Sequence, residues 1–241
     1  MTKPLDDFIA AYGEGFDYAF DNNIILDWYP RRIMALCPGG GSMLELGLGH
    51  GLTTQRFSQH FSRHLVLDGS GSVIAQFRNQ YPDSDAEVLE TYFEDFETDE
   101  RFDVIVMGFI LEHVADPGLI LRKFRHLLKP GGRCFVSVPN AESLHRRFGH
   151  AAGLLDDVMT LGTGDQELGR VRLYSSITLD RELRDAAYRV VRTEGVFLKP
   201  FTTSQLQSLH LDPVILEAMC AVGVAYPELC CALLTEATAT S

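Results

Sequence analysis

Between residues 40 and 140 the sequence alternates short apolar runs with longer amphipathic stretches. The apolar runs, typical of buried strands, lie at 42–46, 64–68, 87–90, 102–107 and 133–138, and the stretches with helical spacing lie at 51–61, 71–80 and 117–128. Strand–helix alternation requires crossover connections, which favour a parallel sheet with helices on both faces. We therefore expect an α/β fold whose ligand binds at the carboxyl ends of the strands.

The rest of the chain extends this core into one domain of 241 residues. We expect a helical cap over 1–39, the sheet core over 40–140, an irregular lid over 141–178, and the remainder of the sheet over 179–241. The last part should hold a helix near 204–222 between strands near 189–198 and 228–235. Thr178 is a candidate N-cap for the helix that begins at Leu179, and Lys129-Pro130-Gly131-Gly132 should end the helix at 117–128.

Composition limits the partners and the compartment. With 21 basic and 33 acidic residues, the net charge is −12, so the surface repels a phosphate backbone and nucleic acid is not expected as a partner. The five cysteines form no CxxC pair and are expected to be reduced. The first residues lack an apolar stretch, so no signal peptide is expected, and no run reaches about 18 apolar residues, so no membrane span is expected; we therefore expect a cytoplasmic protein.

The strongest motif is Glu45-Leu46-Gly47-Leu48-Gly49-His50-Gly51, directly after the first strand. Glycines permit a tight turn with positive φ and a close approach of a ligand to the backbone, and the next helix presents free N–H groups. A dinucleotide loop more usually reads GxGxxG, whereas the spacing here is GxGxG. The carboxylate of Glu45, two residues before Gly47, suits a ligand with an ammonium group and a sulfonium. A glycine-rich turn without any ligand is the alternative.

Three further segments fall at strand ends in register with this loop. Asp68, followed by Gly69, ends the second strand and can accept both hydroxyls of a ribose; capping of the following helix is the alternative role. After the third strand, Tyr92, Phe93 and Glu94 can pack on an adenine and read its edge, or be ordinary loop residues. Gly108 ends the fourth strand, where it would let a cofactor lie over the sheet.

This order of motifs resembles the class I S-adenosylmethionine (SAM)-dependent methyltransferases. The resemblance covers residues 40–140, through ELGLGHG, FDVIV, LEHVADP and LLKPGG, and lies nearest the branch of ubiquinone-biosynthesis, natural-product and sugar methyltransferases. It implies a Rossmann-like sheet of order 3-2-1-4-5-7-6 with the last strand antiparallel. It also implies that SAM is the cofactor, S-adenosylhomocysteine (SAH) the product, and Tyr18 of the N-terminal cap a contact of SAM. Tyr92-Phe93 departs from the family, in which many members have Asp and a small residue.

Methyl transfer from a sulfonium mainly requires that the nucleophile be positioned, with a general base for its proton. His113, which follows the fourth strand beside Glu112, is the expected base because its usual pKa lies near neutrality. A structural role for this histidine is the alternative. Glu112 is expected to orient the cofactor region. No further cluster of acids and histidines supports a metal site, so no metal is expected.

The expected acceptor is a small molecule methylated on oxygen or nitrogen. Arg147, Arg172 and Tyr174 of the lid, with Arg170 and Lys199, are candidates for binding an anionic acceptor, and a solvated basic face is the alternative. Two other functions remain open: an NAD(P)-dependent oxidoreductase on a Rossmann fold, and a SAM-binding protein without catalysis. We expect a monomer or a homodimer.

Overall fold

The computed structural model describes residues 19–240, and within them one seven-stranded sheet has the order β3-β2-β1-β4-β5-β7-β6. The strands are β1 Ser42–Leu46, β2 Arg63–Asp68, β3 Glu87–Glu90, β4 Phe102–Gly108, β5 Leu128–Pro139, β6 Tyr188–Val196 and β7 Ala232–Ala239. The pairs from β3 to β5 are parallel, and β7 runs antiparallel to both of its neighbours. The expected fold and strand order are confirmed.

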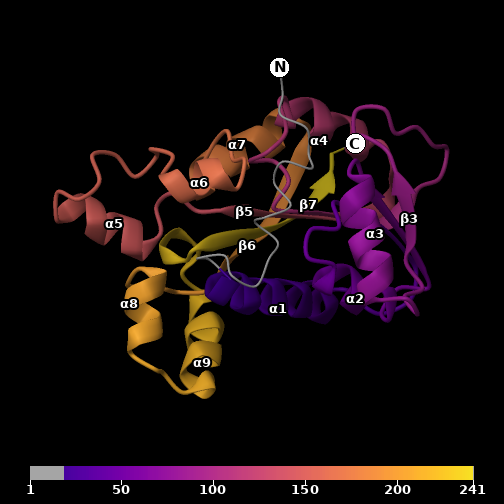
Figure 1. Ribbon diagram of the computed structural model, residues 1–241. Helices are drawn as coiled ribbons and strands as arrows, with labels where there is room; N and C mark the ends of the chain where they lie inside the picture. Colours follow the sequence, from indigo (N-terminus) through magenta and orange to yellow (C-terminus); the bar gives the residue numbers. More distant parts are fainter. Residues whose placement is uncertain (1–18, 241) are drawn as a thin grey trace.

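Helices cover both faces of this sheet (Figure 1). They are α1 Ala19–Leu36, α2 Leu52–Ser58, α3 Gly71–Gln80, α4 Pro117–Arg125, α5 Leu144–Ala151, α6 Thr163–Glu167, α7 Ser176–Asp185, α8 Thr203–Ser208 and α9 Pro213–Gly223. In this view α4, α6 and α7 lie above the sheet and α1 and α2 below it, while α5 and the α8–α9 hairpin project at the left. The described part of the expected N-terminal cap is thus a single helix, α1.

The alternation of side chains along β4 explains the two main cores. Ile105 and Met107 point to the face covered by α4 and α7, whereas Val104 and Val106 point to the face covered by α1 and α2. All four side chains are at most 4% exposed. A strand buried on both faces reads as a continuous apolar run, which is why this segment was recognisable in the sequence.

The glycine pair after α4 does not act as expected. The helix ends at Arg125, and Lys129-Pro130-Gly131-Gly132 lies inside β5 instead of separating a helix from a later strand. The backbone makes this possible through a register shift between Phe102 and Val104 and a positive φ of 77° at Gly131. The irregular segment therefore lengthens the strand at its entrance.

Other boundaries also differ from those expected. The α7 helix is capped by Ser175, whose hydroxyl accepts from the N–H of Thr178, so Thr178 is the third residue of a capping box and not the N-cap. The helix expected near 204–222 is two helices, because Asp212 and Pro213 start a new one.

The lid, residues 141–178, contains α5 and α6. The last strand begins at Ala232, later than expected.

Two further observations concern membrane-spanning helices and the cysteines. None of the helices within residues 19–240 is long and apolar enough to cross a membrane. All five cysteines are unpaired, and only Cys231 is not fully buried.

Candidate functional site

The glycine loop leaves β1 through three left-handed residues and enters α2. Gly47, Gly49 and Gly51 have φ values of 82°, 50° and 74°. A Cβ on Gly47 would lie 2.7 Å from the Ile110 side chain, and one on Gly51 would lie 2.6 Å from the ring of Phe77, whereas one on Gly49 would have no heavy atom within 4 Å. Two of the glycines therefore permit protein packing, and Gly49 alone faces open space that a ligand can fill.

The Glu45 carboxylate lies beneath this loop and is 2% exposed. It accepts hydrogen bonds from the hydroxyls of Thr53 (3.1 Å) and Thr54 (2.8 Å) and lies 3.0 Å from Nε2 of His64. These contacts tie the end of β1 to the first turn of α2 and to β2. Direct contact between Glu45 and a cofactor stays a prediction, and the contacts within the protein give it a positioning role.

Asp68 holds the loop from the end of β2. One carboxylate oxygen accepts the Leu48 N–H at 2.9 Å and the other accepts the Ser70 N–H at 2.8 Å. The Asp68 carbonyl also accepts the N–H of Thr91, which brings the segment after β3 alongside. These contacts fix the carboxylate beside the glycine loop, and its contact with ribose hydroxyls stays a prediction. The capping of α3 falls to Ser70, whose hydroxyl accepts from Val73.

The other residues expected to contact the cofactor lie after β2 and β3. Tyr92 is 56% exposed, while Phe93 packs against the core on the α4 side of the sheet. The Glu94 carbonyl accepts from Lys123, and Gly69 lies in the turn between Asp68 and Ser70. Contacts of all four with a cofactor stay predictions. Tyr18 lies outside the described residues.

Gly108 packs against a side chain of α1, and its contact with a cofactor stays a prediction. A Cβ there would lie 2.5 Å from the Tyr29 hydroxyl, so the space over the strand end is filled by a side chain of α1. Tyr29 is 2% exposed and packs edge-on against Phe109, with ring centroids 5.7 Å apart. Burial raises the pKa of Tyr29, the nearby Glu45 charge adds to this, and the Thr53 hydroxyl opposes it. Tyr29 thus joins α1 to the Glu45 cluster.

The loop after β4 places Glu112 and His113 side by side. Glu112 is 0% exposed, and His113 is 36% exposed with Nε2 lying 3.9 Å from Glu112 Oε1. Burial raises the pKa of Glu112 to about 7, opposed by the charge of Arg170. Loss of hydration, together with the charges of Arg170 and Arg172, lowers the pKa of His113 to about 4. A neutral imidazole can accept a proton, so the pair is able to act as a base.

The two lid arginines expected to bind the acceptor both make contacts with protein groups. The Arg172 guanidinium donates to the carbonyls of Leu111, Val114 and Ala115, so it clamps the loop that carries Glu112 and His113. Arg147 donates to the carbonyl and carboxylate of Glu142 on the exposed side of α5. Their contact with an acceptor stays a prediction, but positioning is the role that the geometry gives Arg172.

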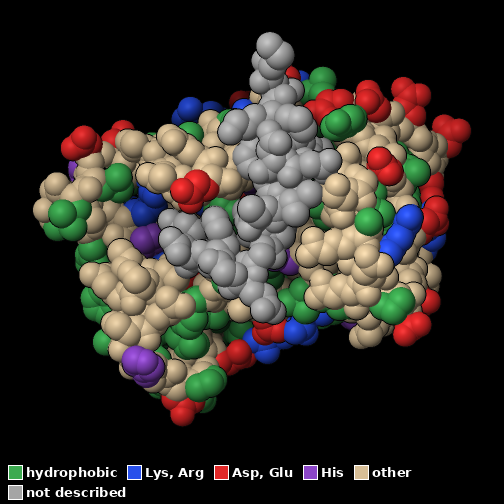
Figure 2. Space-filling model, viewed as in Figure 1, with side chains coloured by type: hydrophobic (Ala, Val, Ile, Leu, Met, Phe, Trp, Pro, Cys, Tyr) green, Lys and Arg blue, Asp and Glu red, His purple; other side chains and the backbone are tan. Residues whose placement is uncertain are grey.

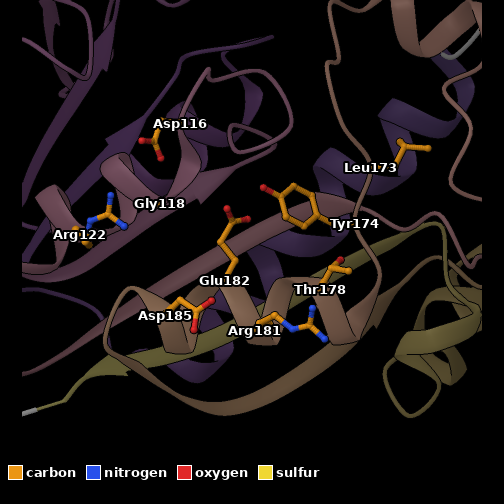
Figure 3. Close-up of a pocket in the computed structure, with 9 residues that line it drawn as sticks. All are labelled: Asp116, Gly118, Arg122, Leu173, Tyr174, Thr178, Arg181, Glu182 and Asp185. Atoms are coloured by element: carbon orange, nitrogen blue, oxygen red, sulfur yellow. The ribbon is translucent and has the colours of Figure 1, made fainter.

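Tyr174 lies in a groove of about 420 Å³ between α4 and α7 (Figure 3). The ring is 3% exposed, and its hydroxyl lies 3.5 Å from the Leu111 carbonyl. Charges of both signs line the groove, among them Asp116, Arg122, Arg181 and Glu182. Acceptor binding by Tyr174 stays a prediction.

Several side chains around the site were not found from the sequence. Thr53, Thr54 and His64 complete the Glu45 cluster, and Tyr29 fills the space over Gly108. The two threonines directly follow the glycine loop, so their position carried a signal; His64 and Tyr29 carried none. Within residues 19–240, no three His, Cys, Asp or Glu side chains gather in a way that could hold a metal ion.

The geometry of the loop fits SAM. The open space at Gly49, the free N–H groups at the start of α2 and the Asp68 carboxylate beside the loop provide room, donors and acceptors for an adenosyl amino acid. Residues 47–51 and 68 come from adjacent strands, because β1 pairs with β2 on one side and with β4 on the other. The His113 loop therefore starts from the strand next to the glycine loop.

Comparison with known proteins places the chain. A family model described as "Methyltransferase domain" matches residues 21–193. The ubiquinone biosynthesis O-methyltransferase of Nitrobacter winogradskyi is 34% identical over 106 residues, which cover 43% of this chain and 41% of that protein. The enzyme of the same name from Xylella fastidiosa (strain 9a5c) is 32% identical over 123 residues, 49% of each chain. The chain thus spans less than half the length of these curated relatives.

Solved structures extend the likeness over the whole fold. The N-methyltransferase NodS from Bradyrhizobium japonicum WM9, in complex with SAH, is similar with a TM-score of 0.63 at 16% identity, covering 98% of both chains. The matched family model covers residues 21–193, well over half of the sequence. The chain therefore belongs to the methyltransferase-domain family and to the class I SAM-dependent methyltransferases.

Proposed function

We propose that this chain transfers the methyl group of SAM to an oxygen or nitrogen of a small molecule, such as a natural-product intermediate, a sugar or a carboxylate. The observation that carries the proposal is the juxtaposition of two loops on neighbouring strands. The loop after β1 has open space at Gly49 beside Asp68, and the loop after β4 presents a half-exposed His113 backed by buried Glu112.

The cofactor would be held by the glycine loop and Asp68. Gly49 gives access to the backbone, and Gly47 and Gly51 keep the loop in its left-handed conformation. Asp68 fixes the loop through the Leu48 N–H, and its carboxylate at the end of β2 is the proposed acceptor of the ribose hydroxyls. Glu45 supports the loop from below through the threonines of α2.

Bound SAM supplies an electrophilic methyl group on a sulfonium that leaves as a neutral thioether. The protein's task is to orient the acceptor and to hold its proton. His113 is the proposed proton acceptor, since it is neutral at physiological pH and 36% exposed. Arg172 fixes the backbone on both sides of this histidine, which keeps the imidazole in place.

Calorimetry with SAH tests the cofactor part of the proposal. Wild-type protein should bind SAH and not NAD, and Asp68→Ala should weaken SAH binding at least tenfold, because the Leu48 N–H loses its partner and the ribose loses its acceptor. Lack of SAH binding by folded protein would refute the proposal, and NAD binding would favour the oxidoreductase alternative.

Product analysis tests catalysis. A panel of hydroxyl, amine and carboxylate acceptors incubated with SAM should yield one product heavier by a methyl group. SAH binding without any product across the panel would favour the non-catalytic alternative.

A further inference from the structure

Buried polar atoms without partners gather where the lid meets the loop after β4. Both carboxylate oxygens of Glu112, Nδ1 of His145, Nε of Arg170 and Oγ of Ser143 are buried and make no hydrogen bond within the described structure. A buried polar group that lacks a partner costs about 1–3 kcal/mol, so a group of them needs an explanation.

These atoms belong to one neighbourhood, organised by Asp165 of α6. Arg170 Nη1 donates to Asp165 at 2.7 Å, and Arg146, next to His145, lies 3.7 Å from the other Asp165 oxygen. The charge of Arg170 acts on both Glu112 and His113. The Val171 N–H donates to the Glu112 carbonyl, which joins this lid segment to the loop after β4.

Among the described residues, this neighbourhood has four cations and three anions, although the whole protein is at −12. Its cations are Arg146, Arg170, Arg172 and Lys199, and its anions are Asp21, Asp165 and Glu112. Burial, together with the charges of Lys199 and Arg146, lowers the pKa of His145 to about 3, and the charge of Asp165 opposes this. Figure 2 shows basic and histidine side chains in the hollow between the α5–α6 segment and the α8 helix. An ammonium group is therefore disfavoured here and an anionic group favoured.

We propose that Glu112, His145 and Arg170 bind the methyl acceptor, and that the acceptor is a hydroxy carboxylate whose hydroxyl donates to Glu112 and whose carboxylate accepts from Arg170. The hydroxyl donates to Glu112 in the bound state, and its proton passes to His113, whose Nε2 lies 3.9 Å from Glu112 Oε1, when the oxygen is methylated. This assignment rests on the proposed methyltransferase function and names the substrate class of that same site. Arg172 and Lys199 set the potential without reaching the acceptor: Arg172 is held by three carbonyls, and Lys199, 2% exposed, is held by Asp21 and by Thr203.

The hydrogen-bonding capacity of Glu112 and Arg170 explains why the ligand needs both a hydroxyl and a carboxylate. Above its pKa of about 7 the Glu112 carboxylate can only accept, so it requires an O–H or N–H on the ligand, whereas Arg170 Nε can only donate and requires an oxygen. A ligand with both groups side by side satisfies the orphaned atoms together. A ligand lacking either group would leave a buried polar atom unpaired, which gives strong discrimination.

Calorimetry at pH 8 on the SAH-loaded full chain, where Glu112 is ionised, tests this with 2-hydroxybenzoate, its methyl ether 2-methoxybenzoate, and the cation benzylamine as probes. Wild-type protein should bind 2-hydroxybenzoate at least tenfold more tightly than either other probe. Arg170→Gln should weaken 2-hydroxybenzoate binding at least tenfold, and Glu112→Leu should abolish the preference over the methyl ether. Arg184→Gln, which alters an exposed arginine of α7, is the matched control and should change nothing.

The outcomes separate this inference from the proposed function. Loss of SAH binding in wild-type protein would refute the methyltransferase proposal itself. Normal SAH binding with no affinity for 2-hydroxybenzoate, with equal affinity for benzylamine, or with no effect of Arg170→Gln would overturn the hydroxy carboxylate assignment alone. Each variant's affinity for SAH reports whether it is folded, and the two variants change different atoms, so misfolding of one leaves the other decisive.

Discussion

Oε1 of Glu112 lies 3.9 Å from Nε2 of His113, yet the two groups are not an ion pair over most of the accessible pH range. The pKa of Glu112 is raised to about 7 and that of His113 is lowered to about 4, each first of all by burial. Between these values the carboxyl is protonated and the imidazole is neutral. The Glu112–His113 pair therefore carries no charge between about pH 4 and pH 7, and it becomes negative when Glu112 ionises.

Glu112→Gln should change how stability depends on pH. In the folded chain the carboxyl keeps its proton up to about pH 7, while in the unfolded chain it ionises near its model value of 4.5. Ionisation of the unfolded state therefore lowers wild-type stability as pH rises from about 4.5 to 7, by about 3 kcal/mol in total. The variant lacks this loss, so its stability relative to wild type should rise by that amount across the same window.

Urea denaturation of both proteins at pH 4.5, 6 and 8 measures this difference. Subtracting the two curves removes the opposite contribution of His113, whose lowered pKa makes stability fall as pH drops from 6.5 to about 4. A difference that stays constant from pH 4.5 to 8 would contradict a raised pKa at Glu112.

His113→Gln should keep SAH affinity and lower turnover at least tenfold, because glutamine cannot take up the acceptor's proton. Initial rates of SAH formation at saturating SAM, with the acceptor identified by the panel, measure this. Since the pKa of His113 is about 4, wild-type turnover should not fall through protonation of this residue between pH 7 and 5. His126→Gln, at the exposed end of α4, is the control. Full turnover in His113→Gln would remove the histidine from the mechanism.

The sequence predicted the sheet well because its strands are locally encoded. The run from Phe102 to Met107 is mostly apolar, as expected for a strand buried on both faces. The segment from Glu45 to Gly51 has the pattern of a strand end followed by a glycine turn that leads into a helix. Strand order followed from the family resemblance, since order depends on long-range pairing. Segment 128–132 was misassigned because its entry into β5 depends on the neighbouring Phe102, which pairs with Leu128.

The site was predicted less completely, since burial and partners are tertiary properties. The positions of Asp68 and His113 followed from strand ends, but nothing local indicated that Tyr29, far away in α1, would fill the space over Gly108. Likewise the basic character of Arg172 was visible in the sequence, whereas the three carbonyls that bind it were not.

Gly49→Ala and Gly51→Ala should separate ligand access from packing. A Cβ on Gly51 meets the Phe77 ring at 2.6 Å, so this variant should lose about 2–4 kcal/mol of stability. Gly49→Ala meets no protein atom and should lose only the ~1 kcal/mol of its left-handed backbone, but SAH binding should weaken at least tenfold. Gly131→Ala, also left-handed and unobstructed, controls for the backbone term. Unchanged SAH affinity in Gly49→Ala would show that the cofactor does not approach this glycine.

Gly108→Ala and Tyr29→Phe form a double-mutant cycle that tests what the absent Cβ of Gly108 accommodates. In the wild-type background the new methyl group lies 2.5 Å from the Tyr29 hydroxyl but 3.2 Å from the ring carbon that bears it. Removing the hydroxyl therefore relieves the closest contact, and Gly108→Ala should cost about 1–3 kcal/mol less in the Tyr29→Phe background than in wild type. Thermal or urea unfolding of the four proteins measures this coupling. If the two substitutions were additive in stability while Gly108→Ala abolished SAH binding, the glycine would serve the cofactor, as the sequence suggested, and not the tyrosine of α1.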